Sequence, residues 1–363
     1  MSQSPKESRQ MIKVLVVDDS ALMRKLLSRC LGSDPAIDVI GAARDAYMAR
    51  DMIKKLNPDV LTLDVEMPGM DGLSFLKNLM RLRPMPVVMV SSLTQRGANV
   101  TMQALDYGAV DFVSKPKIDL EQGMQHCGDE IIAKVKAAAT ARVSALARIA
   151  SRYDKDIQQK KVASVGHAPT CRATKQIIAI GASTGGTEAI KDVLIQLRPD
   201  APGVVITQHI PPVFSRSFAQ RMNRCSSLNV CEAEDGQAIL PGHVFIAPGD
   251  RHLKVERNGA GYRCKLSDEP AVNHHRPSVD VLFDSVVCSA GSNAIGVILT
   301  GMGSDGANGL KQMLESGAHT LVQDEASSVV WGMPKVAMQL GAAKEVLPLN
   351  NIAATLNELV KPS

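Results

Sequence analysis

The stretch that decides the fold of the first third of the chain is Leu61-Thr62-Leu63-Asp64-Val65-Glu66-Met67-Pro68-Gly69-Met70-Asp71-Gly72. It begins with an apolar run of strand length that ends at an aspartate, and turn-forming residues follow. Segments with helical spacing separate this run from four similar runs, at residues 12–17, 37–40, 86–90 and 109–113. Strands that alternate with helices predict a parallel sheet with helices on both faces.

A second series of the same kind begins at Gln176. Apolar runs that predict strands lie at 177–181, 203–208, 243–247, 294–300 and 319–323. The region 229–282 is rich in Gly and Pro and predicts hairpins and loops. The 363 residues are therefore expected to form an α/β protein with two doubly wound parallel-sheet domains, at 11–133 and 176–360. We expect 1–10 to be a disordered tail and 134–175 to be a helix that runs into a flexible basic linker.

The composition is typical of a soluble globular protein, with 45% hydrophobic and 21% charged residues. No long apolar run predicts membrane insertion, and the polar first ten residues do not resemble a signal peptide. The seven cysteines include no Cys-x-x-Cys pair. This pattern argues against a zinc cluster or a disulfide framework and favours a cytoplasmic location.

The net charge of +4 arises in the predicted linker. Residues 134–175 contain ten Lys and Arg against two Asp, a net +8, which leaves the rest of the chain at −4. The plainest interpretation is a solvated charged helix, and a sharper one is that the linker positions the domains or approaches an acidic surface. Since no helix-turn-helix pattern is visible either, we expect no nucleic-acid partner.

Polar residues mark the ends of four strands in the first predicted sheet. Asp18 and Asp19 follow the first strand, Asp64 ends the third, Ser91 ends the fourth and Lys115 follows the fifth. Because the carboxyl ends of parallel strands share one edge, these side chains should converge. Crowded carboxylates suit Mg²⁺, and a phosphoryl group on Asp64 would be held by the metal, Ser91 and Lys115. A single aspartate here could instead be a helix N-cap, but the whole set is more specific.

The second series opens with a strand that ends in Gly181-Ala182-Ser183-Thr184-Gly185-Gly186. The Gly-x-Ser-x-Gly spacing predicts a sharp turn that exposes a nucleophilic serine, although a Gly-Ser turn before a helix is also an anion-binding loop. His209 follows the next strand and Asp305 follows the strand at 294–299, so both belong to the same edge. A nucleophilic serine needs a histidine base that a carboxylate orients, and this set supplies all three groups.

The loop Gly301-Met302-Gly303-Ser304-Asp305-Gly306 supports a second interpretation. With Asp324 and Glu325 about 20 residues further on, it has the outline of a dinucleotide-binding loop. Against this hypothesis, Asp305 would face a pyrophosphate, and Ser183 and His209 would have no function.

The remaining histidines carry weaker signals. His274 and His275 lie in a predicted loop without metal-ligand spacing, and His243 and His319 lie in strand-and-helix segments, so we assign them no role. His252 follows Ala247-Pro248-Gly249-Asp250-Arg251 in a loop that could line a cleft, and it stays unassigned.

Residues 11–133 resemble the receiver domain of response regulators, through Asp18-Asp19, Asp64, Ser91 and Lys115-Pro116. The resemblance implies a flavodoxin-like fold in which Asp64 accepts a phosphoryl group from a histidine kinase. It implies that Asp19, Asp64 and the backbone carbonyl of Glu66 hold Mg²⁺, with Asp18 acting largely through water. It also implies that Ser91 and Lys115 sense the phosphoryl group and that Phe112 is the aromatic switch residue.

From about 176 to its end the chain resembles the chemotaxis receptor protein-glutamate methylesterases. The resemblance rests on the motifs around Ser183 and Asp305, Gln208-His209-Ile210-Pro211, and Trp331-Gly332-Met333-Pro334-Lys335. It implies a Rossmann-like serine hydrolase that removes methyl groups from glutamate esters on chemoreceptors and that in some members deamidates receptor glutamines. Ser183 would attack the ester, His209 would transfer the proton and Asp305 would orient the imidazole. The backbone N–H of Met302, assisted by Thr184, would bind the oxyanion.

Together, the two resemblances imply a phosphorylation-activated enzyme of adaptation in bacterial chemotaxis. The unphosphorylated receiver would cover the esterase site, so removing the receiver should raise the basal activity. The implied partners are methylated chemoreceptors and a histidine kinase, with Mg²⁺ for the receiver and no cofactor for ester hydrolysis. We expect a cytoplasmic monomer, without membrane insertion, that is recruited to receptor clusters. Two alternatives rank lower: an NAD-dependent oxidoreductase that uses Gly301-x-Gly303-x-x-Gly306, and a response regulator with a non-enzymatic output domain.

Overall fold

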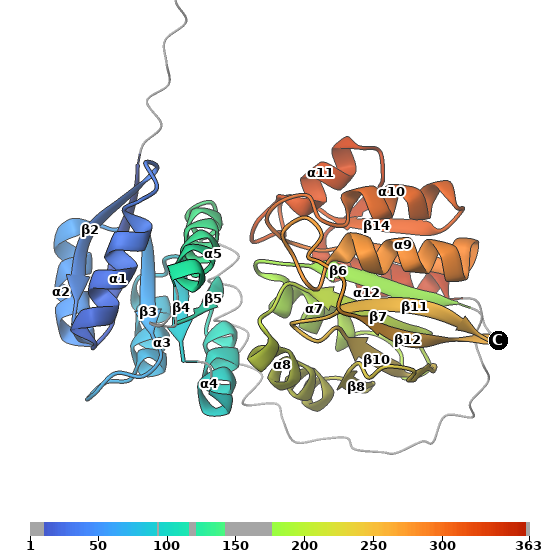
Figure 1. Cartoon of the computed structure of the whole chain (residues 1–363), viewed down its shortest axis with the longest axis horizontal. Coiled ribbons are helices and arrows are strands. Elements are labelled where there is room, and N and C mark those ends of the chain that lie inside the picture. Colours follow the sequence, from blue (N-terminus) through green and yellow to red (C-terminus); the bar gives the residue numbers. More distant parts are fainter. Residues whose placement is uncertain (1–10, 93, 116–120, 142–175, 361–363) are drawn as a thin grey trace, which may run out of the picture. The chain divides into compact units, whose positions relative to one another are not determined.

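A computed structural model describes residues 11–92, 94–115, 121–141 and 176–360. They form two compact α/β units (Figure 1). The predicted tail at 1–10, most of the predicted linker and Pro116 lie outside the described residues. Within these residues, no helix is long and apolar enough to span a membrane.

The first unit, blue to teal in Figure 1, is built on a parallel five-stranded sheet with the order β2-β1-β3-β4-β5. The central strand β3 is buried at every residue, as its apolar sequence predicts. The strands are β1 (Ile12–Val17), β2 (Ile37–Ala43), β3 (Val60–Asp64), β4 (Val87–Ser91) and β5 (Asp111–Ser114). The helices are α1 (Ala21–Leu31), α2 (Ala46–Leu56), α3 (Gly72–Leu82) and α5 (Glu121–Ala139), and α4 (Gln95–Asp106) lies between β4 and β5 in the chain. The predicted five-stranded parallel sheet is confirmed.

Helix α5 corrects the predicted boundary of this domain at residue 133. The helix continues to Ala139, and Val135 and Ala138 are fully buried in the core of the first unit. Lys134 donates hydrogen bonds to the Phe112 carbonyl oxygen (2.6 Å) and to Asp111 Oδ1 (3.2 Å) on β5. The first six residues assigned to the linker therefore belong to the last helix of the first unit, because their buried face packs on the sheet.

The second unit, green to red in Figure 1, is built on a parallel seven-stranded sheet with the order β15-β14-β13-β6-β7-β10-β8. A small antiparallel sheet has the order β11-β12-β9. The strands are β6 (Ile177–Ala182), β7 (Gly203–Gln208), β8 (Asn229–Glu232), β9 (Ala238–Ile239), β10 (His243–Ile246), β11 (His252–Asn258), β12 (Gly261–Ser267), β13 (Ala294–Ile298), β14 (His319–Gln323) and β15 (Glu345–Leu347). The helices are α7 (Gly186–Leu194), α8 (Pro212–Cys225), α9 (Val279–Ala290), the 3₁₀ helix η1 (Gly291–Asn293), α10 (Ala307–Glu315), α11 (Met333–Gln339) and α12 (Leu349–Leu359).

All five predicted strands of this unit are present, and the region 229–282 contains the β11–β12 hairpin. Two strands of the main sheet were not predicted, β8 and β15. Both are short edge strands, and of their residues only Val230 is fully buried. A strand with so little buried apolar surface leaves a weak sequence pattern.

The strand order reverses beside β6, and this point locates the ligand crevice. From β6 the chain adds β7 on one side and returns to add β13 on the other. Ligands of doubly wound sheets bind beyond the carboxyl ends of the strands at such a switch point. The loops after β6, β7 and β13 meet there, and they carry Ser183, His209 and Asp305.

Candidate functional site

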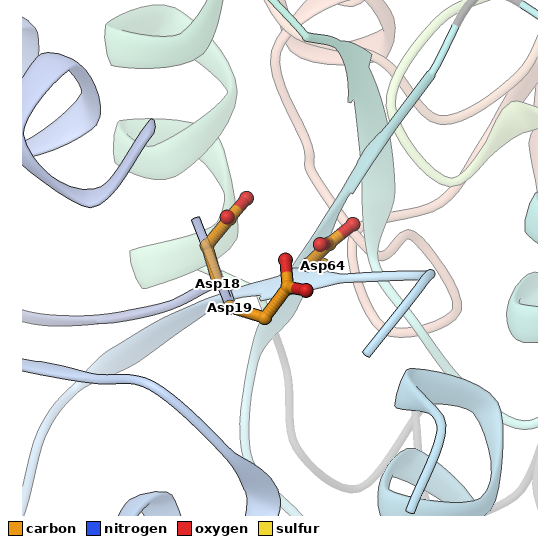
Figure 2. Close-up of side chains that lie close together, drawn as sticks. All are labelled: Asp18, Asp19 and Asp64. Carbon is orange, nitrogen blue, oxygen red and sulfur yellow. The ribbon is translucent and has the colours of Figure 1, made fainter. Parts of the chain in front are cut away.

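Three aspartates of the first unit converge at the carboxyl ends of β1 and β3 (Figure 2). Asp18 and Asp19 follow β1 and Asp64 ends β3, and one oxygen from each lies within 4.8 Å of the others. Asp18 and Asp64 are fully buried, whereas Asp19 is exposed at the mouth of the pocket. An all-oxygen set with one open side is a donor set suited to Mg²⁺, so the residues fit the expected ion.

Lys115, just after β5, is the cation of this acidic pocket. Its Nζ atom lies 2.8 Å from Asp64 Oδ2 and 3.2 Å from Asp18 Oδ2. Burial raises the pKa of Asp64 to about 6, and the charge of Asp18 adds to the effect while Lys115 opposes it. Burial likewise raises the pKa of Asp18. One ammonium therefore leaves two buried carboxylates incompletely neutralised, which favours a second cation.

The other residues predicted for the receiver site have mixed placements. Ser91 is buried at the end of β4, and its hydroxyl donates a long hydrogen bond (3.4 Å) to the Ser92 carbonyl oxygen. The Glu66 N–H donates to Asp64 Oδ1 (3.1 Å), and nothing in the structure tests the predicted metal contact of its carbonyl group. Phe112 is buried, with Lys134 Nζ 5.1 Å from its ring centroid. Their predicted roles therefore stay predictions.

In the second unit, the serine turn has the geometry that its glycines permit. Gly185 has φ +76° and caps the N-terminus of α7, and the Gly186 N–H donates to the Ser183 carbonyl oxygen (2.7 Å). A Cβ atom on Gly185 would stand 2.7 Å from Val329 Cβ, so a side chain fits neither the backbone nor the space. Ser183 is held half-buried at the tip of the turn, and its hydroxyl makes no hydrogen bond within the described residues.

Backbone contacts bring the loops after β6 and β7 together. The His209 N–H donates to the Ala182 carbonyl oxygen (3.2 Å). The Gln208 amide donates to the carbonyl oxygens of Ser183 (2.9 Å) and His209 (3.2 Å). These bonds fix the histidine beside the serine, although no direct bond joins the Ser183 hydroxyl to the His209 ring in the described structure.

The structure joins His209 to Asp305 directly, with 2.8 Å between Nε2 and Oδ2. Burial acts to raise the pKa of Asp305, but the hydrogen bond and charge of His209 and the N–H groups around the carboxylate outweigh it and lower the pKa. An ionised carboxylate can only accept, so Nε2 carries the proton. In the neutral imidazole Nδ1 then holds the lone pair, and Nδ1 is buried without a hydrogen-bond partner in the described residues. A base with its lone pair unused is what a weak serine nucleophile requires.

Five donors surround the Asp305 carboxylate. Besides His209, it accepts from the Asn273 amide (2.8 Å), the Ser278 hydroxyl (2.8 Å) and the backbone N–H groups of Val279 (2.7 Å) and Asp280 (3.3 Å). The last two groups open helix α9, whose N-terminal dipole also favours a negative charge. Asp305 is therefore held ionised and in one orientation.

The predicted oxyanion donors differ in their surroundings. The Met302 N–H makes no hydrogen bond within the described residues. It lies in the loop whose Gly301 approaches Ser183 closely, so this N–H is available to donate to an oxyanion beside the serine. Thr184 is buried, and its carbonyl oxygen accepts from the Thr300 hydroxyl (3.0 Å). This contact ties the β6 and β13 loops together, and the participation of Thr184 in oxyanion binding stays a prediction.

The glycine-rich loop after β13 has surroundings that do not suit a dinucleotide. A Cβ atom on Gly301 would stand 2.8 Å from Ser183 Cβ, so this glycine lets the serine loop approach. Asp324, which belongs to the dinucleotide-binding outline, accepts from the N–H (2.9 Å) and the hydroxyl (2.5 Å) of Ser327. The loop thus brings Gly301 beside Ser183 and carries Asp305 to His209.

Sequence reasoning missed two histidines of this region. The His275 ring, to which the sequence assigned no role, stacks on the His209 ring at 3.6 Å between centroids and 13° between planes. His252 is fully buried: its Nε2 lies 3.0 Å from the Pro270 carbonyl oxygen and its Nδ1 accepts from the Ser278 N–H (3.1 Å). It fixes the segment that carries Ser278. Neither contact follows from sequence spacing.

An acidic receiver-type pocket and a Ser-His-Asp set at a switch point define a response regulator joined to a serine hydrolase. Residues 14–126 match the response regulator receiver domain family, and residues 178–356 match the CheB methylesterase family. The chain belongs to the CheB methylesterases that carry a receiver domain.

Similar proteins agree along nearly the whole chain. A protein of Xanthomonas campestris named protein-glutamate methylesterase/protein-glutamine glutaminase 1 is 59% identical over 346 residues, which cover 95% of this chain and 96% of that protein. A Hydrogenovibrio crunogenus protein-glutamate methylesterase/protein-glutamine glutaminase is 54% identical and covers 96% of this chain and 99% of its own. The crystal structure of the Thermotoga maritima CheB methylesterase catalytic domain aligns over 52% of this chain and all of its own, with 39% identity and a TM-score of 0.51. The family assignment supports the hydrolase and not the oxidoreductase.

Proposed function

We propose that this chain hydrolyses glutamate γ-methyl esters on chemoreceptor cytoplasmic domains, releasing methanol, and that it deamidates receptor glutamines at the same site. The observation that carries the proposal is the His209–Asp305 pair, with its unpartnered Nδ1 atom beside the Ser183 turn. The family assignment supplies the class of substrate.

Each group has one role in the proposed reaction. Nδ1 of His209 takes the Ser183 hydroxyl proton while the serine oxygen attacks the γ-carbonyl carbon. The Met302 N–H stabilises the oxyanion of the tetrahedral intermediate. When the carbon–oxygen bond to the leaving group breaks, Nδ1–H protonates it, and methanol departs.

Water then completes the reaction through the same groups. His209 removes a proton from a water molecule that attacks the acyl-enzyme, and the proton returns to Ser183 as the glutamate product leaves. With a glutamine substrate the first leaving group is ammonia, and the second half is identical. Asp305 keeps Nε2 protonated throughout, so the proton moves only at Nδ1.

The receiver is proposed to control this activity through Asp64. A histidine kinase is the expected phosphodonor, and a phosphoryl group adds roughly 1.5 to 2 negative charges to the acidic pocket. Asp18, Asp19 and Asp64 would hold Mg²⁺, which offsets the charge of the carboxylates and of the incoming phosphoryl group. Lys115 already contacts Asp64 and would pair with the phosphoryl oxygens. The enzyme would act in the cytoplasm at receptor clusters.

The test of the proposed chemistry is methanol release from a methylated receptor fragment. Ser183→Ala should reduce the rate by about 10⁵-fold or more, since nucleophile loss removes the covalent route. Ser304→Ala, a serine in the loop that carries Asp305, is the matched control and should keep activity within about threefold. If Ser183→Ala released methanol at the wild-type rate, the assignment of Ser183 as the nucleophile would be overturned.

The proposed regulation by the receiver is tested with the variant Asp64→Asn. The variant should keep the basal rate of methanol release and lose all of the increase that a small-molecule phosphodonor produces in the wild-type chain. Activation of Asp64→Asn by phosphodonor would contradict the assignment of Asp64.

A further inference from the structure

A four-residue turn from Val272 to His275 reaches the catalytic pair from two sides. The N–H and carbonyl groups of Val272 and His275 bond to one another in both directions, at 3.0 and 2.9 Å. The two central residues, Asn273 and His274, have φ +52° and +66°. Positive φ at both central positions is the geometry of a type I′ turn, and asparagine tolerates it better than most residues. Val272, Asn273 and His274 are exposed and His275 is half-buried, so core packing does not explain the shape of the turn.

The first contact of the turn comes from the amide of Asn273. Its Nδ2 atom donates to Asp305 Oδ1 (2.8 Å) and to Asp280 Oδ2 (2.7 Å). Both carboxylates are buried, and the pKa of Asp280 is raised by burial and by the charge of Asp305. One NH₂ group therefore bridges two like charges that would otherwise repel each other. The bridge also fixes Oδ1 of Asp305, which leaves Oδ2 to the imidazole.

The second contact comes from the ring of His275. It lies nearly parallel to the His209 ring, and the 3.6 Å separation is that of direct stacking. His209 has only one ring hydrogen bond in the described structure, at Nε2. A ring held at a single point can pivot about that bond, and the stacked face prevents it from doing so.

We propose that the Val272–His275 turn is the positioning device of this active site: Asn273 holds the Asp305 carboxylate, and His275 holds the plane of the His209 ring. Neither residue touches the reacting atoms, so both are positioning residues. The inference rests on the proposed function, because it assumes that His209 and Asp305 act on Ser183. Its chemical effect is to keep Nδ1 aimed at the serine hydroxyl, since a displacement of about 1 Å at a reacting group can reduce a rate by 10²-fold.

The experiment measures kcat and KM for methanol release by the full chain. Asn273→Gly keeps the positive φ and removes only the amide, so kcat should fall by about tenfold while KM stays within twofold. Asn273→Asp keeps the size but places a third carboxylate between the other two, and kcat should fall by about a hundredfold. His274→Gly is the matched control, because it changes the neighbouring turn position, whose exposed side chain makes no hydrogen bond, ion pair or ring contact within the described residues, and it should match the wild-type chain.

The ring contact is tested with a conservative pair of variants. His275→Ala should lower kcat by about tenfold with KM unchanged, whereas His275→Phe, which can stack in the same place, should stay within about threefold of the wild-type rate. Proton NMR of the His209 Nε2 proton gives a readout that does not depend on turnover. Its resonance should broaden in His275→Ala and stay sharp in His275→Phe and His274→Gly.

The inference is overturned if Asn273→Gly and His275→Ala both keep the wild-type kcat. It is also overturned if His275→Phe has the same low kcat and the same broadened His209 Nε2 proton resonance as His275→Ala. If Ser183→Ala retains activity, the proposed function itself fails. A dead Ser183→Ala together with unaffected turn variants removes only the role of the turn. The melting temperature of each variant shows whether it has folded. For a variant of low stability, the His209 Nε2 proton resonance recorded at low temperature shows whether the imidazole is still held in place.

Discussion

Asp64 and Asp305 occupy equivalent places in the two units, and their electrostatics are opposite. Asp64 ends β3 and Asp305 lies in the loop after β13, at the carboxyl edges of two parallel sheets, and each is at least 98% buried. Burial raises the pKa of Asp64 to about 6, yet the pKa of Asp305 is lowered. Burial acts in the same direction on both carboxyl groups, so the difference has to come from what surrounds them.

The donors and the charges around each carboxylate account for the difference. Asp305 accepts five hydrogen bonds, from His209, Asn273, Ser278 and two N–H groups of α9. Asp64 accepts from Lys115 and the Glu66 N–H, and it shares Lys115 with Asp18. A fully bonded carboxylate is a fixed orienting group. An incompletely bonded one has free oxygen lone pairs for a cation or for transfer of a phosphoryl group.

The largest expected effect comes from removing the charge of Asp305. In Asp305→Asn an amide replaces the carboxylate, so Nε2 of His209 loses its ionised acceptor and the imidazole can take the wrong tautomer. Removing the equivalent charge in serine proteases lowers kcat by about 10⁴-fold, and we expect a similar loss of methanol release here. Asp284→Asn on α9 is the matched control, since Asp284 accepts no hydrogen bond within the described residues, and it should retain activity. A loss of less than tenfold in Asp305→Asn would mean that the carboxylate does not orient the base.

The second effect tests the incomplete neutralisation of the receiver pocket. Lys115→Met removes the ammonium that contacts both Asp18 and Asp64, so we expect the free energy of unfolding of the receiver to fall by about 1 to 3 kcal/mol. Mg²⁺ at about 100 times its Kd should return up to about 2.7 kcal/mol, and chelation should remove this gain. Hydrogen exchange of peptides from β1 and β3 measures the change in this unit.

The single tryptophan gives the internal control for that experiment. Trp331 lies in the catalytic unit, so its fluorescence should report the same unfolding transition with and without Mg²⁺. Equal exchange of β1 and β3 in the wild-type and Lys115→Met chains, with no response to Mg²⁺, would show that the pocket is already neutralised.

The sequence predicted the parts of both sites that lie at strand ends. A parallel sheet brings the carboxyl ends of its strands to one edge, so Asp18, Asp64, Ser183, His209 and Asp305 could be placed from the strand pattern alone. The positions of the five residues in the structure agree with that pattern. Their roles in catalysis and phosphorylation await the experiments above.

The sequence did not predict the contacts that long loops make. Asn273 and His275 lie more than 30 and 60 residues from Asp305 and His209 in the chain, and a turn with positive φ brings them back. A loop of this kind has no periodicity, and the nitrogen that His209 offers to Asp305 depends on side-chain rotation. The predicted domain boundary at residue 133 was wrong for a related reason. From sequence alone Lys134 is one more charged residue of the basic linker, and only its hydrogen bonds to β5 show that it belongs to the first unit.

The smallest expected effect tests how redundant the donors of Asp305 are. Ser278→Ala removes one of five hydrogen bonds to a carboxylate that stays ionised, so the free energy of unfolding should fall by about 1 kcal/mol and kcat by less than about fivefold. The Ser278 N–H still donates to His252, so the segment keeps its anchor, and Ser285→Ala on α9 is a control for a serine outside this network. Urea denaturation followed by Trp331 fluorescence and methanol release measure the two quantities. If kcat of Ser278→Ala fell as far as kcat of Asp305→Asn, the Asp305 carboxylate would depend on every one of its donors. Asp305 would then resemble the incompletely bonded Asp64 more closely than its five hydrogen bonds suggest.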